Sequence, residues 1–232
     1  MERNADRRPE VVLVAPHLIS PWSYQRQADV DPPMGLLSIG SLLDERGFRA
    51  TIIDACVNPD YMDDLNAALE RKPLFVGISA MTSQLANGLA IARHVREHRP
   101  DLPLVWGGVH PTLFPDQTCR HPLVDVAVLR EGEYAALDLA QAFAQTAHPN
   151  FGQIAGLAYL LDGQVRTTEA RPYSPLDSLP FPNYDLLDVE RYFYPDLEPG
   201  APNRTRTLML HTGTGCLFRC AFCVNTILYR RR

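Results

Sequence analysis

Leu74-Phe75-Val76-Gly77-Ile78-Ser79 is the stretch of sequence that decides the fold. It carries no charged residue, and Pro73 directly precedes it. A strand with one solvated face alternates apolar and polar residues, whereas a strand covered on both faces shows a continuous apolar run of this kind. Because parallel sheets are the ones that helices cover on both faces, the stretch predicts a buried strand of a parallel α/β sheet.

Similar short apolar runs occur on both sides of this strand, and helix-like segments separate them. The runs cover residues 11–15, 50–55, 104–106 and 124–129. Apolar residues recur at helical spacing in the segments 36–43, 60–71, 85–95 and 133–145. We expect Gly47 to close the first of these helices and Asp60 to cap the second. The alternation predicts a doubly wound, five-stranded parallel sheet of flavodoxin size, complete by about residue 147.

The sequence changes character after this first domain, which we place at residues 1–147. Residues 156–161 and 164–168 flank Asp162-Gly163, a pair that suits the positive φ angles of a type I′ turn, so they predict a β-hairpin. Residues 171–202 are rich in proline and aromatic residues and indicate an ordered, wrapping linker. We assign 148–204 to hairpin and linker. A further apolar run at 207–210 predicts a strand that opens a second domain at 205–232.

The composition excludes several classes of protein. The chain has 232 residues, of which 46% are hydrophobic, and a formal net charge of -5, which gives no basic surface for nucleic acid. No apolar run approaches the roughly 18 residues of a membrane span, and the polar N-terminus lacks the apolar core of a signal peptide. We therefore expect a cytoplasmic protein with free thiols, in which Cys56 and Cys119 are small buried residues.

Three further cysteines follow the last apolar run in the pattern C-x3-C-x2-C, at Cys216, Cys220 and Cys223. Thiolates at this spacing can converge from one loop and hold three irons of a [4Fe-4S] cluster, which leaves the fourth iron open for an exogenous ligand. A zinc site with His211 as fourth ligand is the alternative, but zinc ribbons usually pair two such knuckles and no second knuckle exists here. A disulfide is a weaker alternative.

The cysteine pattern, with Phe222 just before its last member, resembles the radical S-adenosylmethionine (SAM) superfamily. In that superfamily the amino and carboxylate groups of SAM chelate the open iron. The resemblance implies a [4Fe-4S] cluster on the three cysteines, SAM as a second cofactor, and a SAM contact by Phe222.

The residues that follow the predicted strands show what the first domain binds. Gly-x-Gly-x-x-Gly does not follow the first strand, which argues against a dinucleotide site, and the acidic residues of a response-regulator receiver are absent from both expected places. Ser79-Ala80-Met81-Thr82 follows the third strand and Gly107-Gly108-Val109-His110 follows the fourth. In an open α/β sheet, ligands bind beyond these carboxyl ends.

This pair of loops resembles the cobalamin-binding (B12-binding) domain, in which Ser-x-Leu and Gly-Gly stand at the same places. Small residues leave space for a nucleotide tail between sheet and helices, and the hydroxyls of Ser79 and Thr82 can donate hydrogen bonds to it. Met81 replaces the family's leucine with little change in volume. The alternative is that Gly107-Gly108 only makes a tight turn and Ser79 only caps a helix.

Families that join this domain to the three-cysteine loop resemble the chain from about residue 11 to 230. They are the cobalamin-dependent radical SAM proteins, and residues 32–36, 131–133 and 179–182 match them as well. The cobalamin contacts that the resemblance implies are Ser79, Met81, Thr82, Gly107, Gly108, His110, Glu131 and Gly132. His110 is expected to fix a loop or contact the tail. Because the chain lacks Asp-x-His-x-x-Gly, we expect no histidine on the lower face of cobalt.

The resemblance implies a methyltransferase, or a ring-forming or rearranging relative, that uses the cluster and SAM to generate a 5′-deoxyadenosyl radical. Its partners would be a small-molecule substrate and a reductant such as ferredoxin or flavodoxin. A barrel takes on the order of 200 residues, and the sequence ends soon after Cys223. We therefore expect a truncated barrel that is inactive alone and could act with a separate chain. The alternative function is a non-catalytic cobalamin-binding module.

Overall fold

The computed structural model describes residues 8–17, 31–193, 209–210, 213–218 and 220–229. Its centre is a sheet in the order β2-β1-β3-β4-β5-β6-β7. The first five strands are parallel to one another, with bounds Glu10–Ala15 (β1), Arg49–Asp54 (β2), Val76–Ser79 (β3), Leu104–Gly107 (β4) and Val126–Val128 (β5). The predicted five-stranded parallel sheet is confirmed, and 2-1-3-4-5 is the flavodoxin-like strand order.

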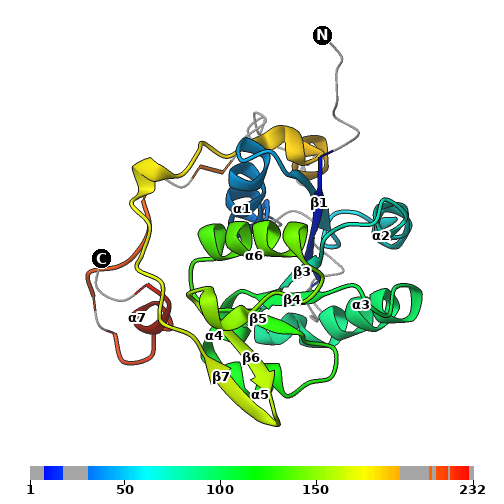
Figure 1. Cartoon of the computed structure of the whole chain (residues 1–232). Helices are drawn as coiled ribbons and strands as arrows, with labels where there is room; N and C mark the ends of the chain where they lie inside the picture. Colours follow the sequence, from blue (N-terminus) through cyan, green and yellow to red (C-terminus); the bar gives the residue numbers. More distant parts are fainter. Residues whose placement is uncertain (1–7, 18–30, 194–208, 211–212, 219, 230–232) are drawn as a thin grey trace, which may run out of the picture.

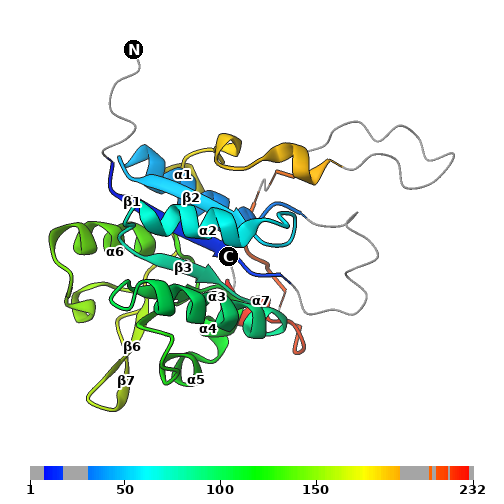
Figure 2. The same ribbon diagram turned by 90° about the vertical axis from the view of Figure 1, so that its right-hand side faces the viewer.

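Helices cover both faces of the sheet (Figures 1 and 2). α1 (Met34–Glu45) and α6 (Glu133–Gln145) pack on one face, and α2 (Tyr61–Glu70) and α3 (Leu85–His98) on the other. Alternate residues along a strand pack against the two helical layers. Leu13 and Phe75 face α1 and α6, whereas Val14 and Val76 face α2 and α3. This double burial is the reason for the continuous apolar run that starts at Leu74.

The structure confirms one of the two predicted helix ends and contradicts the other in one detail. Gly47 follows the end of α1 with φ of +87°, a left-handed conformation that closes a helix without strain in glycine. Asp60 stands at the start of α2, but its side chain makes no capping hydrogen bond, because its backbone is not extended there. The predicted cap is therefore wrong in this detail. Two short helices, α4 (Val109–Leu113) and α5 (Pro115–Cys119), connect β4 to β5.

The β-hairpin is confirmed, but it belongs to the main sheet. β6 (Leu157–Leu161) and β7 (Gln164–Thr167) flank Asp162-Gly163, and both turn residues have the positive φ that a type I′ turn needs. β6 pairs antiparallel with β5, so the described sheet has seven strands rather than five. The three-residue β5 would otherwise be an open edge, and Leu157 and Ala158 are fully buried against it. The domain boundaries at 147 and 204 stay predictions.

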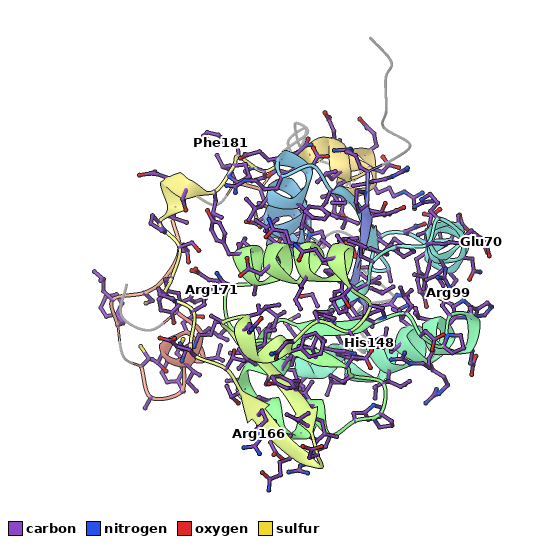
Figure 3. The ribbon with its side chains drawn as sticks, in the orientation of Figure 1. Glu70, Arg99, His148, Arg166, Arg171 and Phe181 are labelled. Carbon is purple, nitrogen blue, oxygen red and sulfur yellow. The ribbon has the colours of Figure 1, made fainter. Side chains whose placement is uncertain are left out.

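The linker wraps over α6 and then α1, as expected from its composition. Arg171 forms an ion pair with Asp138 of α6, and Tyr134 of α6 donates a hydrogen bond to the carbonyl oxygen of Ser178 at 3.0 Å (Figure 3 labels Arg171). Three short 3₁₀ helices follow, with bounds Leu176–Ser178, Tyr184–Leu186 and Val189–Tyr192. Near the second of them the backbone N–H of Asn183 donates to Ser41 Oγ of α1 at 2.7 Å.

The end of the chain is described only in part. Half of the predicted strand at 207–210 lies outside the described residues, and Met209 and Leu210 belong to no strand. A short helix, α7 (Asn225–Leu228), follows the cysteine loop. None of the helices in the described ranges is both long and apolar enough to cross a membrane.

Candidate functional site

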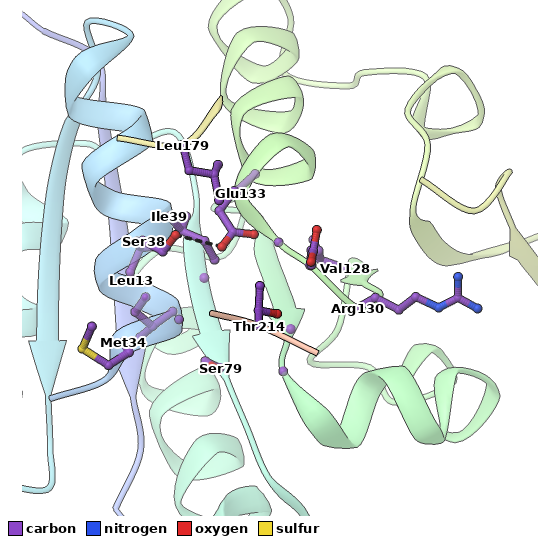
Figure 4. A pocket seen from close by; sticks show the side chains of 18 of the residues that line it. Leu13, Met34, Ser38, Ile39, Ser79, Val128, Arg130, Glu133, Leu179 and Thr214 are labelled. Carbon is purple, nitrogen blue, oxygen red and sulfur yellow. Dashed lines mark hydrogen bonds between the residues drawn. The ribbon is translucent and has the colours of Figure 1, made fainter. Parts of the chain in front are cut away.

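A cavity of about 720 Å³ lies between the sheet and the layer of α1 and α6 (Figure 4). Its walls include the carboxyl ends of β3, β4 and β5. The chain leaves β1 for α1 on one face of the sheet and leaves the neighbouring β3 for α3 on the other face, and the cavity lies where these two connections diverge. This reversal is the switch point at which doubly wound sheets bind their ligands.

Hydrogen bonds hold the ends of β3 and β4 together beneath the cavity. The N–H of Ala80 donates to the carbonyl oxygen of Gly107 at 2.9 Å, and the N–H of His110 donates to the carbonyl oxygen of Ala80 at 3.0 Å. Gly108 lies between these bonds with φ of +94°, and a Cβ atom there would be 3.0 Å from both the Ala80 nitrogen and Ser79 Oγ. The close approach of the two strand ends therefore requires glycine at 108, whatever the cavity holds.

Gly107 has a different role. It lines the cavity, and a Cβ atom there would meet only Val128, at 3.8 Å. Its place in β4 alternates with Trp106, which faces α2 and α3, so a side chain at 107 would face α1 and α6. A glycine at this position leaves open the space that a side chain would fill.

The end of β5 is fixed by Thr112 and a strained residue. Thr112 donates to the carbonyl oxygen of Gly108 at 2.8 Å and accepts the N–H of Arg130 at 2.9 Å. Arg130 has φ of +65°, which is uncommon outside glycine and costs of order 1 kcal/mol or more. This turn brings Glu131, Gly132 and Glu133 into the cavity wall.

Glu131 and Glu133, which follow β5, place their carboxylates in the cavity wall. Ser38 Oγ of α1 donates to Glu133 Oε1 at 2.8 Å, and Glu131 Oε2 accepts the N–H of Ser174 at 2.9 Å. Burial raises the pKa of Glu133, hydrogen bonds from backbone and from Ser38 oppose the rise, and the charge of Glu131 adds to it. The cavity therefore holds a carboxyl group that is costly to ionise.

The linker and the end of the chain border the cavity on its outer side. Residues 179–182 line it, as do Leu210, Gly213 and Thr214 before the cysteine loop and Leu228 and Tyr229 after it. The hydroxyl of Tyr173 in the linker donates a hydrogen bond to the carbonyl oxygen of Leu228 at 2.9 Å and so joins the linker to the end of the chain. Burial raises the pKa of Tyr229, with contributions from Glu133 and Glu131. Phe181, labelled in Figure 3, lies on the rim and is 88% exposed.

Five of the eight predicted cobalamin contacts line the cavity: Ser79, Gly107, Gly108, Glu131 and Gly132. Met81, Thr82 and His110 are not among its lining residues. His110 is 4% exposed, its Nδ1 lies 3.1 Å from Thr82 Oγ1, and burial lowers its pKa. This is the arrangement of a residue that fixes the loop after β4.

The three cysteines lie on one loop, with Cys216 and Cys223 half-buried and Cys220 exposed. The N–H of Cys223 donates to the carbonyl oxygen of Cys220 at 3.0 Å. Within the described ranges, no three His, Cys, Asp or Glu side chains are grouped so that they could hold a metal ion. The cluster and the contact of SAM with Phe222, which is 93% exposed, therefore stay predictions. His211, the alternative fourth zinc ligand, lies outside the described residues.

Sequence reasoning named Glu131, but it did not identify the contact between Ser38 and Glu133 in the same wall of the cavity. Ser38 and Glu133 meet across 95 positions of sequence, and no local pattern marks such a pair. Arg130 carried no signal either, since a positive φ outside glycine is not readable from residue type. The linker at 179–182 did carry a signal, because it had matched the family pattern, and it lines the cavity.

Comparison with known proteins gives an independent result for the first domain. Residues 28–140 match the model of the B12 binding domain family. An uncharacterized methyltransferase of Pyrococcus horikoshii is 29% identical over 204 residues, which are 87% of this chain and 42% of the relative. The anaerobic magnesium-protoporphyrin IX monomethyl ester cyclase of Rubrivivax gelatinosus is 29% identical over 199 residues, 83% of this chain and 34% of the relative. The chain thus spans less than half the length of these curated relatives.

Solved structures show the same fold. The cobalamin-dependent SAM radical enzyme OxsB, with aqua-cobalamin and SAM bound, superimposes with a TM-score of 0.67 at 22% identity, over 80% of this chain and 25% of OxsB. The radical SAM methyltransferase TsrM of Kitasatospora setae, with tryptophan and a SAM analogue bound, gives 0.65 at 20% identity, over 96% of this chain and 42% of TsrM. The resemblance to cobalamin-dependent radical SAM proteins is confirmed at the level of the fold.

Gly107 and Gly108 should differ in how much an added methyl group lowers the stability of the protein. Gly108→Ala should lower the free energy of unfolding by about 1–3 kcal/mol, since it combines a positive φ with backbone contacts at 3.0 Å. Gly107→Ala should change it by less than about 0.5 kcal/mol. Urea unfolding followed by circular dichroism checks both, and equal losses would contradict the roles assigned here.

Proposed function

We propose that this chain, whose residues 28–140 match the model of the B12 binding domain family, binds cobalamin in the cavity between the sheet and the layer of α1 and α6. It would do so as part of a cobalamin-dependent radical SAM protein that modifies a small molecule, by methyl transfer, ring closure or rearrangement. The observation that carries the proposal is the open face of Gly107, which lies inside a switch-point cavity of about 720 Å³.

The lining of the cavity suits a ligand with a long nucleotide tail. Leu13, Val105 and Val128 form an apolar floor. Ser79, Glu131 and Glu133 add polar groups. The tail would lie against Gly107, and Ser79 could donate a hydrogen bond to it. Gly108 would contribute indirectly, because it lets the ends of β3 and β4 approach closely enough to form the floor.

The described histidines support cobalt binding without a histidine ligand. The ring of His17 packs edge-on against Tyr61, with centroids 5.0 Å apart, and His110 Nδ1 lies against Thr82. Neither lines the cavity, and no other histidine of the described residues does so. Bound cobalamin would supply a transferable methyl group, while the linker and the terminal segment would limit access of water.

The second part of the proposal concerns the cysteine loop. Cys216, Cys220 and Cys223 would hold a [4Fe-4S] cluster whose open iron binds SAM, with Phe222 beside it. Support comes from the spacing, from the free thiols and from the overlap with TsrM across 96% of this chain. The residues on either side of the loop line the cavity, so the two sites would be neighbours.

Cobalamin binding tests the first part directly. After incubation with hydroxocobalamin and gel filtration, the protein should retain the cofactor, as followed by its visible absorbance. Gly107→Val should lose it, because the new side chain enters the cavity, yet should keep its far-ultraviolet circular dichroism. Absence of binding by the unmodified protein, or equal retention by both proteins, would refute the proposed site.

Anaerobic reconstitution with iron and sulfide tests the second part. The protein should turn brown, because the three ligands come from one loop and can collect iron and sulfide together. We expect the bound iron to be roughly substoichiometric. Replacing any one of the three cysteines with alanine should abolish iron retention, while Cys119→Ala, a buried thiol elsewhere, should not. Stoichiometric zinc in protein purified without added iron would point instead to a structural zinc site.

A further inference from the structure

The polar wall of the cavity contains a pair that the proposed function has not used. Ser38 of α1 donates a hydrogen bond to one carboxylate oxygen of Glu133, the first residue of α6. Both side chains line the cavity, and Figure 4 shows the carboxylate inside it between the two helices. Backbone N–H groups of Gly132 and Glu133 also interact with this carboxylate. Because an ionised carboxylate has about four acceptor sites, it can still accept a hydrogen bond from a molecule in the cavity.

A carboxylate in this position is unfavourable for the protein alone. Its surroundings include the apolar side chains of Ile39 and Val128, and a second carboxylate, Glu131, is close enough to disfavour its ionisation. Tyr229, which directly follows α7, also lines the cavity, and the charge of Glu133 contributes to raising its pKa; Arg130 and Asp177 are further charged residues of the lining. Buried carboxylates need hydrogen-bond donors, and Ser38 supplies one side-chain donor.

A purely structural purpose explains the pair poorly. α1 and α6 already pack through Leu36, Leu42, Leu137 and other apolar residues of the core. A polar pair within such an interface adds little net stability, since the desolvation of the carboxylate offsets the hydrogen bond. A donor brought by a ligand would remove that penalty and would turn the pair into a recognition element.

We propose that Ser38 and Glu133 form the recognition site for an N–H or O–H donor of the bound cobalamin, with Ser38 positioning the carboxylate and Glu133 accepting the hydrogen bond. This inference rests on the proposed function. Cobalamin offers such donors in two places, the amides around its macrocycle and the ribose hydroxyls of its nucleotide tail. Both would form a charge-assisted hydrogen bond of the same kind.

The chain offers matched control positions for both residues. Ser41 lies one turn after Ser38 on α1, accepts a hydrogen bond from Asn183 and does not line the cavity. Asp138 lies on α6 with Glu133, pairs with Arg171 and does not line the cavity either. Ser38→Ala is therefore compared with Ser41→Ala, and Glu133→Gln with Asp138→Asn.

The experiment measures the affinity of the full chain for hydroxocobalamin by equilibrium dialysis. Glu133→Leu should weaken binding by about tenfold or more, as expected for the loss of a charge-assisted hydrogen bond. Ser38→Ala and Glu133→Gln keep an acceptor at residue 133 and should each weaken binding by roughly fivefold to tenfold. Both controls should stay within about twofold of the unmodified protein. The Glu133→Leu protein should also unfold at the same or a higher urea concentration, because the substitution removes a buried carboxylate. A purely structural role of Glu133 would instead predict that weaker binding comes with lower stability.

Cobinamide, which keeps the macrocycle and its amides but lacks the nucleotide tail, identifies the donor. Equal losses for both ligands would assign a macrocycle amide, and a loss confined to cobalamin would assign the tail hydroxyl; either supports the inference. If the unmodified chain binds cobalamin and the variants bind it with the same affinity, this inference is overturned and the proposed cobalamin site is not affected. Failure of the unmodified chain to bind would overturn both.

Discussion

The cavity depends on the contact between Gly108 and Ala80. There the ends of β3 and β4 approach so closely that a single added carbon would be 3.0 Å from backbone nitrogen. The two hydrogen bonds across this contact fix the loop that carries Ser79 and the loop that carries His110. Thr112 then extends the arrangement to Arg130 at the end of β5. The ends of three strands are thereby held in place before any ligand binds, which lowers the cost of ordering them on binding.

The sequence allowed good prediction where the physical signal is local. Continuous apolar runs marked the parallel strands because each strand is covered on both faces, and Asp162-Gly163 marked the hairpin because its turn needs positive φ angles. Ser79 and Gly107 were placed at the cavity because the carboxyl ends of neighbouring parallel strands meet at one edge. Gly108 also lies at the cavity, but its missing side chain faces Ala80, so the space it leaves open is between the strand ends and not in the cavity.

Prediction failed where the signal is long-range. Pairing of β6 with β5 joins residues about thirty positions apart, and neither strand shows from its own residues that it needs the other. The contact of Ser38 with Glu133 arises because the connections after β1 and after β5 lead to the same face of the sheet. The terminal segment is a similar case: Leu228 borders the same cavity as Gly107, which lies more than a hundred positions earlier in the sequence. Such contacts follow from topology and not from any local pattern.

The central claim is that cobalamin occupies the cavity at the switch point. Hydrogen–deuterium exchange of the full chain, with and without hydroxocobalamin, tests it most directly because it locates the ligand without altering a residue. The account predicts slower exchange in peptides that contain residues 79–82, 107–110 and 130–133, and in α1, with no change in the hairpin of β6 and β7. Protection confined to the hairpin or to α2 and α3, or no protection despite bound cofactor, would contradict it.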